Sequence, residues 1–380
     1  MRPFITLQAA VMALLGFAGV FVQAAHGATA LARYTGLMLA TTAAATVLSY
    51  ALGMRMNISA KRLVQAGFAV PAALLWWADG RPELLALTFG TFFGMTWGAR
   101  HWLELHSLSD AERDGYAAHA IALAVGVALT TTLLVSALLA LFNEAHTPVY
   151  ALFAALSAAG ALWAGRRLPS APPVALLAPL SVLRQSAYLA CLPLLLFESG
   201  LLGIGLVLTA TGAVRSLDSA SHYGWAASAA TLAGALALRA LRNKRHSENR
   251  VGWMGAACCG VVAAAALLGA SALWPALFVL YLLLQAAVNP FWAASEHVLN
   301  QRAMDFRASV GDRVAAREGT LGLFRVLTLW LFWVAAAGLD DHQRLIAGAA
   351  LMGLAAALEY GLGRRWLAAQ SATAAHASAP

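Results

Sequence analysis

Charged residues are scarce in this chain. Asp, Glu, Lys and Arg make up 11% of its 380 residues and hydrophobic residues make up 61%. Soluble domains carry roughly a quarter charged residues. No interval is long and polar enough to form a separate soluble domain, and the mean hydropathy is +0.71. The composition therefore excludes a soluble globular protein and indicates a membrane protein with room for about a dozen spans of roughly 20 residues.

The patterns that accompany metal and cofactor chemistry are also missing. Cys191, Cys258 and Cys259 fall inside apolar runs and form neither a disulfide framework nor a metal-binding spacing. The histidines show no HxxxH or HExxH pattern, and no Walker motif is present. No cluster of His, Asp and Glu has a catalytic spacing at one membrane face. We therefore expect no metal, no cofactor and no enzymatic activity.

Basic residues outnumber acidic ones, and the formal net charge is +8. In a soluble protein this charge would suggest nucleic acid, but in a membrane protein the excess of Lys and Arg in cytoplasmic loops explains it better. With both termini inside, 20 of the 25 Lys and Arg residues fall on the cytoplasmic side. The asymmetry predicts cytoplasmic termini, a lipid bilayer as surroundings and no nucleic-acid partner.

Apolar runs separated by turn or charge clusters predict the membrane spans. Helix is the only practical choice for them, because the bilayer core offers no water to unpaired backbone groups. The expected spans are 5–24, 32–53, 63–79, 83–103, 116–142 and 149–165, then 186–213, 221–241, 251–270, 273–295, 318–338 and 343–363. The first run could also pass for a cleaved signal peptide. Because no soluble domain follows it for export, we expect a retained span.

A proline-rich stretch divides these spans into six and six. In residues 165–173, GRRLPSAPP, two arginines mark a helix end and three prolines prevent its continuation. The apolar run 174–183 is too short to span and is typical of an interfacial segment. The expected domains are an N-terminal half (1–165), a cytoplasmic linker (166–185), a C-terminal half (186–366) and a disordered tail (367–380).

A weak internal repeat agrees with this division. Placing Trp97 on Trp292 puts Asp110 on Asp305, an offset of 195 residues, or about half the chain. Two parallel repeats are the arrangement of carriers that rock around a midplane site. The predicted fold class is an all-α integral membrane protein with about 12 transmembrane helices in two six-helix pseudo-symmetric halves.

The longest strongly charged interval runs from Asn289 to Arg325. It cannot face lipid, because each charge left in hydrocarbon costs several kcal/mol. Its acids are Glu296, Asp305, Asp312 and Glu318, and its bases are Arg302, Arg307, Arg313, Arg317 and Arg325. Acids and bases balance between 296 and 318. This balance favours a breakable lock on the cytoplasmic side over a site that attracts an anion.

Two motifs resemble the major facilitator superfamily, in particular its short twelve-span bacterial branch. One is the run from Asp312-Arg313 to Arg317-Glu318, followed by Gly322-Leu-Phe-Arg325 at the start of span eleven. The other is the aromatic end of span four leading into Glu112-Arg113-Asp114. The resemblance implies two rocking six-helix halves and charged groups that act as an inner gate.

The loop between spans two and three departs from the family pattern. That loop usually carries an Asp, but here residues 53–62 read GMRMNISAKR, with Asn57 as the nearest polar residue. Arg55, Lys61 and Arg62 preserve the positive charge. We assign these three to the inner gate and expect the block around 302–318 to carry more of that role.

Glu198 is the strongest candidate for a proton-coupling residue. It lies well inside span seven, roughly 20 Å from Arg184 at about 1.5 Å per residue. A carboxylate at that depth could take up and release a proton as a carrier changes state. A protonated Glu198 that only hydrogen-bonds a neighbouring helix is the alternative.

Arg325 is the second intramembrane charge, and Glu296 or Glu318 are its expected partners. A structural brace and a substrate contact both remain open for it. Gln285 and Asn289 share a helix face beside Pro290, which suits a cavity wall as well as helix–helix hydrogen bonding.

Gln8 and Trp97 are further candidates for pocket lining. For Trp97, packing against lipid or a neighbouring helix is the alternative.

The resemblance implies a secondary active transporter of the bacterial inner membrane, which moves a small solute by alternating access. Protons are the expected coupling ion, and the carrier is expected to be a monomer. An exporter of a lipid-like or amphipathic metabolite is one alternative, suggested by the very apolar walls. A non-transporting scaffold or assembly factor of the same fold is another, favoured by the departure at 53–62.

Overall fold

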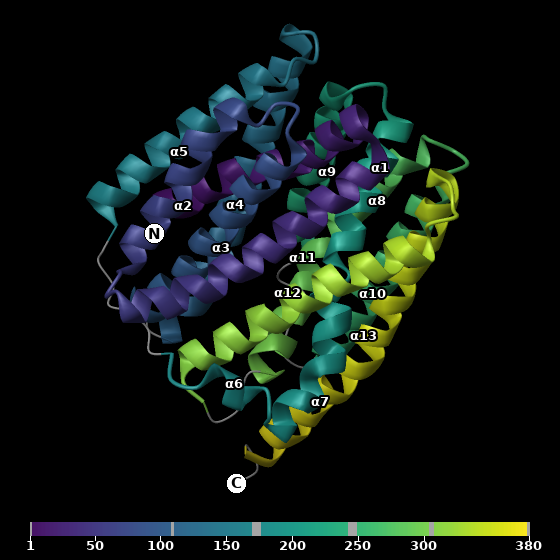
Figure 1. Cartoon of the computed structure of the whole chain (residues 1–380). Coiled ribbons are helices and arrows are strands. Elements are labelled where there is room, and N and C mark those ends of the chain that lie inside the picture. Colours follow the sequence, from purple (N-terminus) through teal and green to yellow (C-terminus); the bar gives the residue numbers. More distant parts are fainter. Residues whose placement is uncertain (1, 108–109, 169–175, 242–248, 304–307, 378–380) are drawn as a thin grey trace.

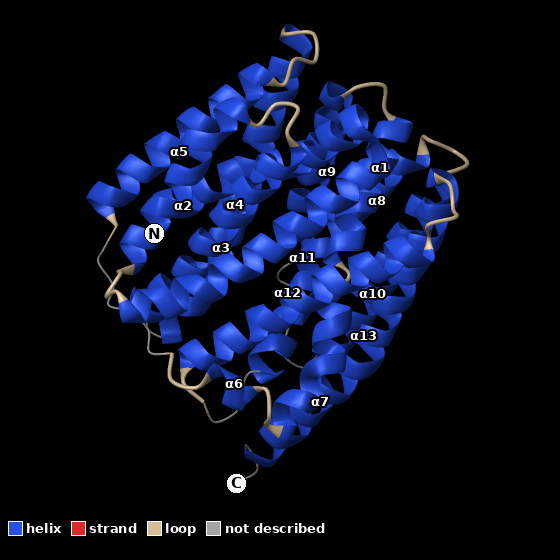
Figure 2. Ribbon diagram, in the orientation of Figure 1, coloured by secondary structure: helices blue, strands red, loops and turns tan. Residues whose placement is uncertain are grey.

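The computed structural model describes residues 2–107, 110–168, 176–241, 249–303 and 308–377. These residues form helices joined by short loops, with no strand among them (Figure 2). The helices are α1 (Arg2–Arg55), α2 (Ala60–Leu74), η1 (Leu75–Trp77), α3 (Pro82–Ser107), α4 (Asp110–Leu141), α5 (Thr147–Arg167), α6 (Pro179–Val182), α7 (Ser186–Leu195), η2 (Leu196–Gly200), α8 (Leu202–Ser216), α9 (Ala220–Leu241), α10 (Arg250–Ala270), α11 (Leu277–Ala303), α12 (Val310–Ala335) and α13 (Asp341–Ala377).

Helix α1 is two helices joined at Gly27. This glycine has φ 78° and ψ 179°, a conformation outside the helical region that residues with a side chain rarely adopt. The break falls between the two spans expected at 5–24 and 32–53. One 54-residue element thus supplies two limbs that turn back on each other.

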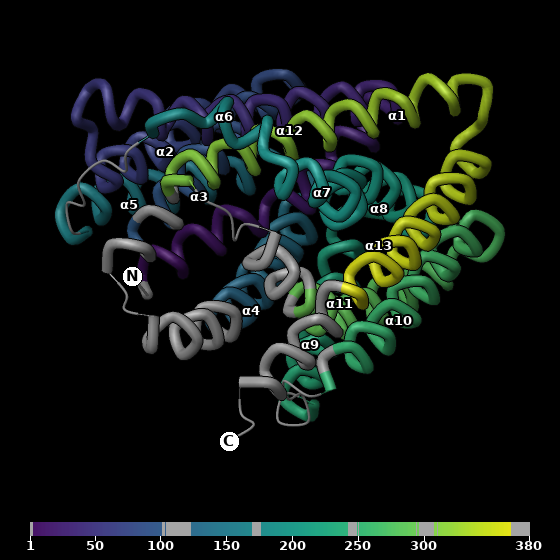
Figure 3. Tube along the Cα trace, turned by 90° about the horizontal axis from the view of Figure 1, so that it is seen from below, coloured from purple at the N-terminus to yellow at the C-terminus, as the bar shows by residue number. Residues whose placement is uncertain are grey.

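The helices pack in two groups that meet along α1. Helices α1 to α5 pack on one another, and α8 to α13 pack on one another. The two groups touch where α1 packs on α8 and α12, and where α4 packs on α9. Figures 1 and 3 place α2, α3 and α5 on one side of the molecule and α10 and α13 on the other, with α1 and α12 between them.

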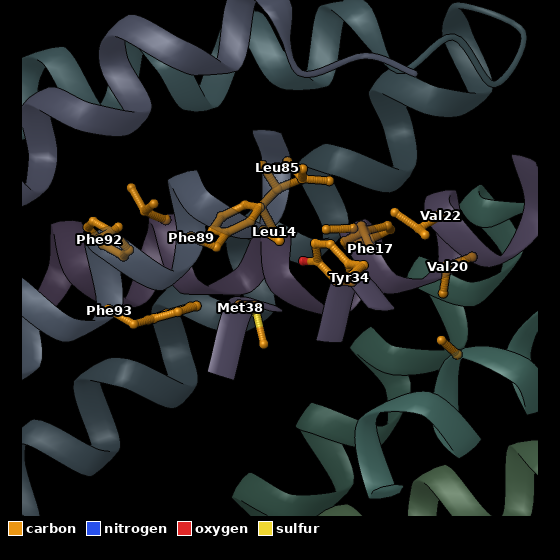
Figure 4. Close-up of a cluster of buried hydrophobic side chains, with 14 of the residues drawn as sticks. Leu14, Phe17, Val20, Val22, Tyr34, Met38, Leu85, Phe89, Phe92 and Phe93 are labelled. Atoms are coloured by element: carbon orange, nitrogen blue, oxygen red, sulfur yellow. The ribbon is translucent and has the colours of Figure 1, made fainter. Parts of the chain in front are cut away.

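Aromatic side chains fill much of the interior around α1. Figure 4 shows Phe17 and Tyr34 from the two limbs of α1 in one buried cluster with Phe89 and Phe92 of α3. Phe17 also meets Tyr223 of α9 edge to face, with ring centroids 5.5 Å apart. Such edge-to-face pairs contribute about 0.5–1.5 kcal/mol beyond their buried area.

Small residues bring α1 close to its neighbours. A side chain at Gly322 of α12 would overlap the Cβ of Ala43, so only glycine allows this approach. On the other face of α1, Thr46 donates to the Gly94 carbonyl of α3 at 3.3 Å and Tyr50 to the Gly98 carbonyl at 3.1 Å. Small residues and interhelical hydrogen bonds are what hold helices together in lipid, where burial alone gains little.

Eight helical segments of the described residues are long and apolar enough to cross a membrane. They are Pro3–Arg55, Leu123–Leu141, Thr147–Arg167, Ser186–Ser216, Ala220–Leu241, Val251–Ala270, Gly311–Ala335 and Asp341–Arg365. Large apolar side chains such as Trp76, Leu162 and Trp330 are more than half exposed. An apolar outer surface of this kind is expected of a multi-pass membrane protein.

Candidate functional site

A cavity of about 430 Å³ lies where α1 meets the C-terminal helices. Both limbs of α1, η2, α8, α9, α10, α11 and α13 contribute to its wall. Its polar lining side chains are Tyr34, Thr35, Glu198, Ser199, Thr209, Tyr223, Tyr281, Gln285, Asn289, Trp292 and Glu359. A volume of this size suits a small organic molecule.

Glu198 lines this cavity from a π-helical turn. The turn, Leu196–Gly200, interrupts the helix between α7 and α8 and follows Pro193, which lacks a backbone N–H. Arg317 Nη2 of α12 lies 3.1 Å from Glu198 Oε1, and Arg317 Nη1 lies 2.6 Å from Glu318 Oε1. One guanidinium therefore bridges two carboxylates, and the three side chains are at most one-fifth exposed.

Arg325 holds the same turn, but through a partner that the sequence did not predict. Its guanidinium donates to the Ser199 hydroxyl from Nε at 3.0 Å and also from Nη2, and to the Ser199 carbonyl at 3.4 Å. Of the expected partners, Glu318 is close enough to interact electrostatically with Arg325, and the side chain of Glu296 lies outside the described residues. The prediction missed Ser199 because the π turn exposes its backbone carbonyl toward α12, which only the fold reveals.

Thr328 completes the contact between α12 and the π turn. Its hydroxyl donates to the Gly200 carbonyl at 2.5 Å. A π turn leaves carbonyl groups without their usual partner in the helix. Arg325 and Thr328 supply donors to two of these carbonyls, so the irregular turn is stabilised from outside.

Glu359 of α13 also lines the cavity, and it was not among the residues predicted from the sequence. Its side chain is 1% exposed. The sequence alone could have identified it, because Glu359 is a lone acid inside the apolar span expected at 343–363. The same pattern singled out Glu198. The cavity thus brings together two carboxylates from helices far apart in the chain.

Uncharged polar groups face the same space. Gln285 and Asn289, predicted to share a face of α11, both line the cavity. The Tyr34 hydroxyl is buried and has no hydrogen-bond partner in the described part of the chain. Thr209 and Tyr281 satisfy each other at 2.9 Å.

Gln8 and Trp97 are among the described residues but do not line the cavity. Gln8 is buried between α1 and α3, where it donates to Thr96 at 3.1 Å and accepts from Arg100 at 3.4 Å. Trp97 stacks under the Arg100 guanidinium at 5.4 Å. The expectation that these two line the pocket is therefore replaced by a role in packing within the N-terminal helices.

Asp312, predicted as a gate charge, is 4% exposed and caps two segments at once. One carboxylate oxygen accepts from the backbone N–H groups of Leu177 and Ala178 at 2.9 Å each. The other accepts from the Ser309 hydroxyl at 2.7 Å, and that hydroxyl in turn caps α12. Asp312 thereby ties the linker and the short helix α6 to the start of α12.

The remaining predicted gate residues are spread over the ends of the helices. Arg55 ends α1, and Lys61 and Arg62 lie in the first turn of α2. Arg313 follows Asp312 in the first turn of α12. Asp305 and the side chain of Glu296 lie outside the described residues.

The described lining of this cavity offers polar and apolar groups that can bind a solute. Its described lining residues include two carboxylates and no Lys, Arg or His. No group of three or more His, Cys, Asp or Glu among the described residues is placed to hold a metal ion. The fold and this cavity define a multi-pass membrane protein with a small-molecule-sized cavity among its helices.

Comparisons with known proteins agree on the fold. No protein-family model and no curated protein matches the sequence. A crystal structure of the nucleoside transporter NupG, a major facilitator protein, matches 95% of this chain and 97% of its own, with a TM-score of 0.66 and 15% identity. A mutant of the same transporter matches with a TM-score of 0.62 and 14% identity. The chain therefore has the major facilitator fold, and neither structural neighbour is an enzyme.

Proposed function

We propose that this protein is a secondary active transporter that moves a small solute across the bacterial inner membrane by alternating access. The observation that carries the proposal is the central cavity, which lies where the two groups of helices meet and is lined by Glu198. A site at this junction becomes accessible from either side when the two groups tilt against each other.

The proposal includes twelve spans in two six-helix halves. Counting the two limbs of α1 separately, α1 to α5 supply six spans, and α7 to α13 supply six when η2 joins α7 to α8. An even number of spans places both termini on the same side. The positive charge of the loops favours the cytoplasm for that side.

Proton coupling is proposed through Glu198. In the structure its charge is balanced by Arg317, which also holds Glu318. A proton on Glu198 would break that pair while leaving Arg317 with Glu318, so the guanidinium is never left unpaired. Glu198 can therefore gain or lose a proton at a small cost in free energy, as a proton-coupling residue must.

Proteoliposomes under an imposed pH gradient test this proposal. Labelled uridine and adenosine are the first probes, because the structural neighbours are nucleoside transporters. We expect the Glu198→Gln protein to lose gradient-driven accumulation but to keep exchange of labelled for unlabelled solute. Glu144→Gln is the control, since Glu144 accepts a hydrogen bond from the Ser221 backbone at 3.1 Å outside the cavity. Undiminished gradient-driven transport by Glu198→Gln would remove this residue from the mechanism.

The inner gate remains part of the proposal. It would be formed by Arg55, Lys61 and Arg62 facing the charged start of α12. Neutralising Asp305, Asp312, Arg313 and Arg317 together should change which side of the membrane reaches a cysteine placed in the cavity. Unchanged cysteine accessibility would count against a gate at this position.

An exporter of amphipathic metabolites is the second candidate. The observation that favours it is the apolar part of the lining, which includes Leu31, Met38, Phe197, Leu206 and Met352. Export by inside-out vesicles, with no uptake of hydrophilic nucleosides, would support it. A protein that binds but moves no probe under any gradient would instead be a scaffold of this fold.

A further inference from the structure

The linker segment, residues 176–183 just before α7, presents large apolar side chains on its outer surface. Leu177 is 74% exposed, Leu180 is 72% exposed and Leu183 is 37% exposed. For comparison, Leu162 in the middle of the span α5 is 60% exposed. The linker segment is itself too short to cross a bilayer. Apolar groups exposed to this degree mark a surface that contacts a membrane or another protein.

The other side of the linker segment is packed against the protein. Val182 is fully buried in a cluster with Tyr188 and Leu195 of α7 and with Ala316 and Leu321 of α12. Figure 1 shows α6, which includes Val182, at the end of the molecule where α12 begins. Val182 therefore fixes the segment on α7 and α12, and the exposed leucines lie on its outer side.

The backbone of the linker segment finds its hydrogen-bond partners within the protein. The N–H of Leu176 donates to the sulfur of Met54 at 3.4 Å. The next two N–H groups, of Leu177 and Ala178, donate to the Asp312 carboxylate at 2.9 Å each. Further along, N–H groups bond to carbonyls of the segment itself. A loop in water can leave such groups to the solvent, but a stretch at the edge of a bilayer must satisfy them internally.

These bonds also fix the depth of the linker segment relative to the bilayer. Met54 lies at the end of the candidate span Pro3–Arg55, and Asp312 lies at the start of the candidate span Gly311–Ala335. The segment is therefore held level with the ends of two spans. Arg184, which follows it directly, is exposed. Arginines near the ends of spans extend toward the lipid head groups.

We propose that the linker segment is a lipid anchor, in which Leu177, Leu180 and Leu183 insert among the acyl chains at the edge of the bilayer. Arg184 then lies among the head groups. Because the segment is bonded to α1 through Met54 and to α12 through Asp312, this lipid contact is made where the two groups of helices meet. The inference goes beyond the proposed transport function and does not depend on it.

Quenching by lipid tests the proposal on the full-length protein. The three native cysteines are replaced by alanine, and one new cysteine carries the fluorophore NBD. The protein is placed in phosphatidylcholine nanodiscs with plain or brominated acyl chains. Leu180→Cys is the test position, Leu162→Cys in α5 is the lipid-facing reference, and Asp218→Cys in the exposed loop before α9 is the reference in water. We expect brominated lipid to quench the label at 180 several-fold more strongly than the label at 218, and about as strongly as the label at 162.

A charge at Leu177 tests whether the leucines insert as one unit. With the label at position 180, Leu177→Asp should reduce quenching several-fold, because a carboxylate is costly to place among acyl chains. Leu177→Met is the matched control, since it keeps an apolar side chain at the same position and should preserve the quenching. Gel-filtration elution and the thermal midpoint check that each variant is folded.

Two results would overturn the proposal. One is a label at position 180 that resists quenching as the label at 218 does, while the label at 162 is quenched. The exposed leucines would then face water or a protein partner. The other is quenching at position 180 that survives Leu177→Asp in a folded protein. Since neither measurement needs a solute or a gradient, quenching without transport removes the transport function alone, and transport without quenching at position 180 removes this inference alone.

Discussion

At the scale of single residues, Ser199 is the group that makes Arg325 tolerable in the middle of a helical bundle. The guanidinium has three hydrogen bonds to this one residue. A charged donor that loses its acceptor keeps the cost of leaving water without the compensating bond. The hydroxyl of Ser199 is thus a stability determinant as well as part of the cavity wall.

Replacing Ser199 by alanine should therefore destabilise the protein. We expect a loss of about 1–3 kcal/mol in the free energy of unfolding, because two hydroxyl-directed bonds vanish while the carbonyl contact remains. Thermal or denaturant unfolding in detergent measures it. Ser181→Ala is the matched control, since the exposed Ser181 hydroxyl only donates to the Ala178 carbonyl and its loss should cost less than about 0.5 kcal/mol. Equal losses in the two variants would contradict the account.

His146 gives the fold a pH dependence outside the membrane spans. Its ring stacks on Phe21 at 4.0 Å and lies 3.6 Å from Asp79. Burial lowers the pKa of His146 below its ordinary value of 6.5, and the neighbouring Asp79 and Glu144 only partly oppose that shift. The folded protein then binds fewer protons here than the unfolded chain does. This contribution to stability is complete above about pH 6.5 and is lost as the pH falls below that value.

Melting temperatures between about pH 5.5 and pH 7.5 test this effect. The wild type should lose more stability at the acidic end than His146→Phe, which keeps a ring for the stack on Phe21 but cannot be protonated. Groups elsewhere titrate equally in both proteins, so the difference between them isolates His146. Parallel curves for the two proteins would show that His146 is not the source.

The intramembrane charges show how far single residues can be interpreted from sequence. Glu198 stood out because it interrupts an apolar run, and Glu359 could have been found by the same rule. The contact of Arg325 with Ser199 could not, because these two residues are brought together only by packing of the π turn on α12. Gln8 and Trp97 were polar or aromatic inside spans, but Gln8 of α1 faces α3, and Trp97 of α3 lies against Arg100 of the same helix, so neither lines the cavity.

At the scale of helices, the sequence predicted nearly every element. Long apolar runs leave helix as the only choice in lipid, so the expected spans and the observed helices agree to within a few residues at most ends. The π turn at Leu196–Gly200 was not foreseen, since no residue type specifies it. The short helix α6 lies within the apolar stretch that was expected to rest at the membrane interface.

The linker is attached to α12 by Asp312, and this attachment can be tested. Asp312→Ala removes the acceptor of the Leu177 and Ala178 N–H groups, so the linker should loosen. We expect trypsin to cleave after the exposed Arg184 several times faster in this variant. Asp312→Asn keeps an amide oxygen as acceptor and should cleave near the wild-type rate. Cleavage that is equally slow in both variants would mean that other contacts hold the linker.

At the scale of the whole molecule, the proposed transport requires the two groups of helices to move against each other. The charge pattern and the proline-rich break suggested two halves, but which helices meet could not be predicted, because side-chain contacts between distant spans leave no local pattern. In the structure α1 makes most of this junction, through α8 and α12. At one point a Cβ on Gly19 of α1 would lie 3.3 Å from the Ala210 Cβ of α8.

A disulfide at that contact should reversibly block the proposed movement of the two helix groups against each other. Disulfides need Cβ atoms about 3.5–4.5 Å apart, so a Gly19→Cys, Ala210→Cys pair should cross-link after small adjustment, once Cys191, Cys258 and Cys259 are replaced by alanine. The control pair, Gly269→Cys with Ala349→Cys, has the same 3.3 Å separation but joins α10 to α13 within one group. We expect oxidation of the first pair to stop transport and reduction to restore it, because the bond ties together groups that must separate. Oxidation of the control pair should leave transport running. Continued transport with the first pair fully cross-linked would mean that α1 and α8 stay together throughout the cycle, and that the moving boundary lies elsewhere.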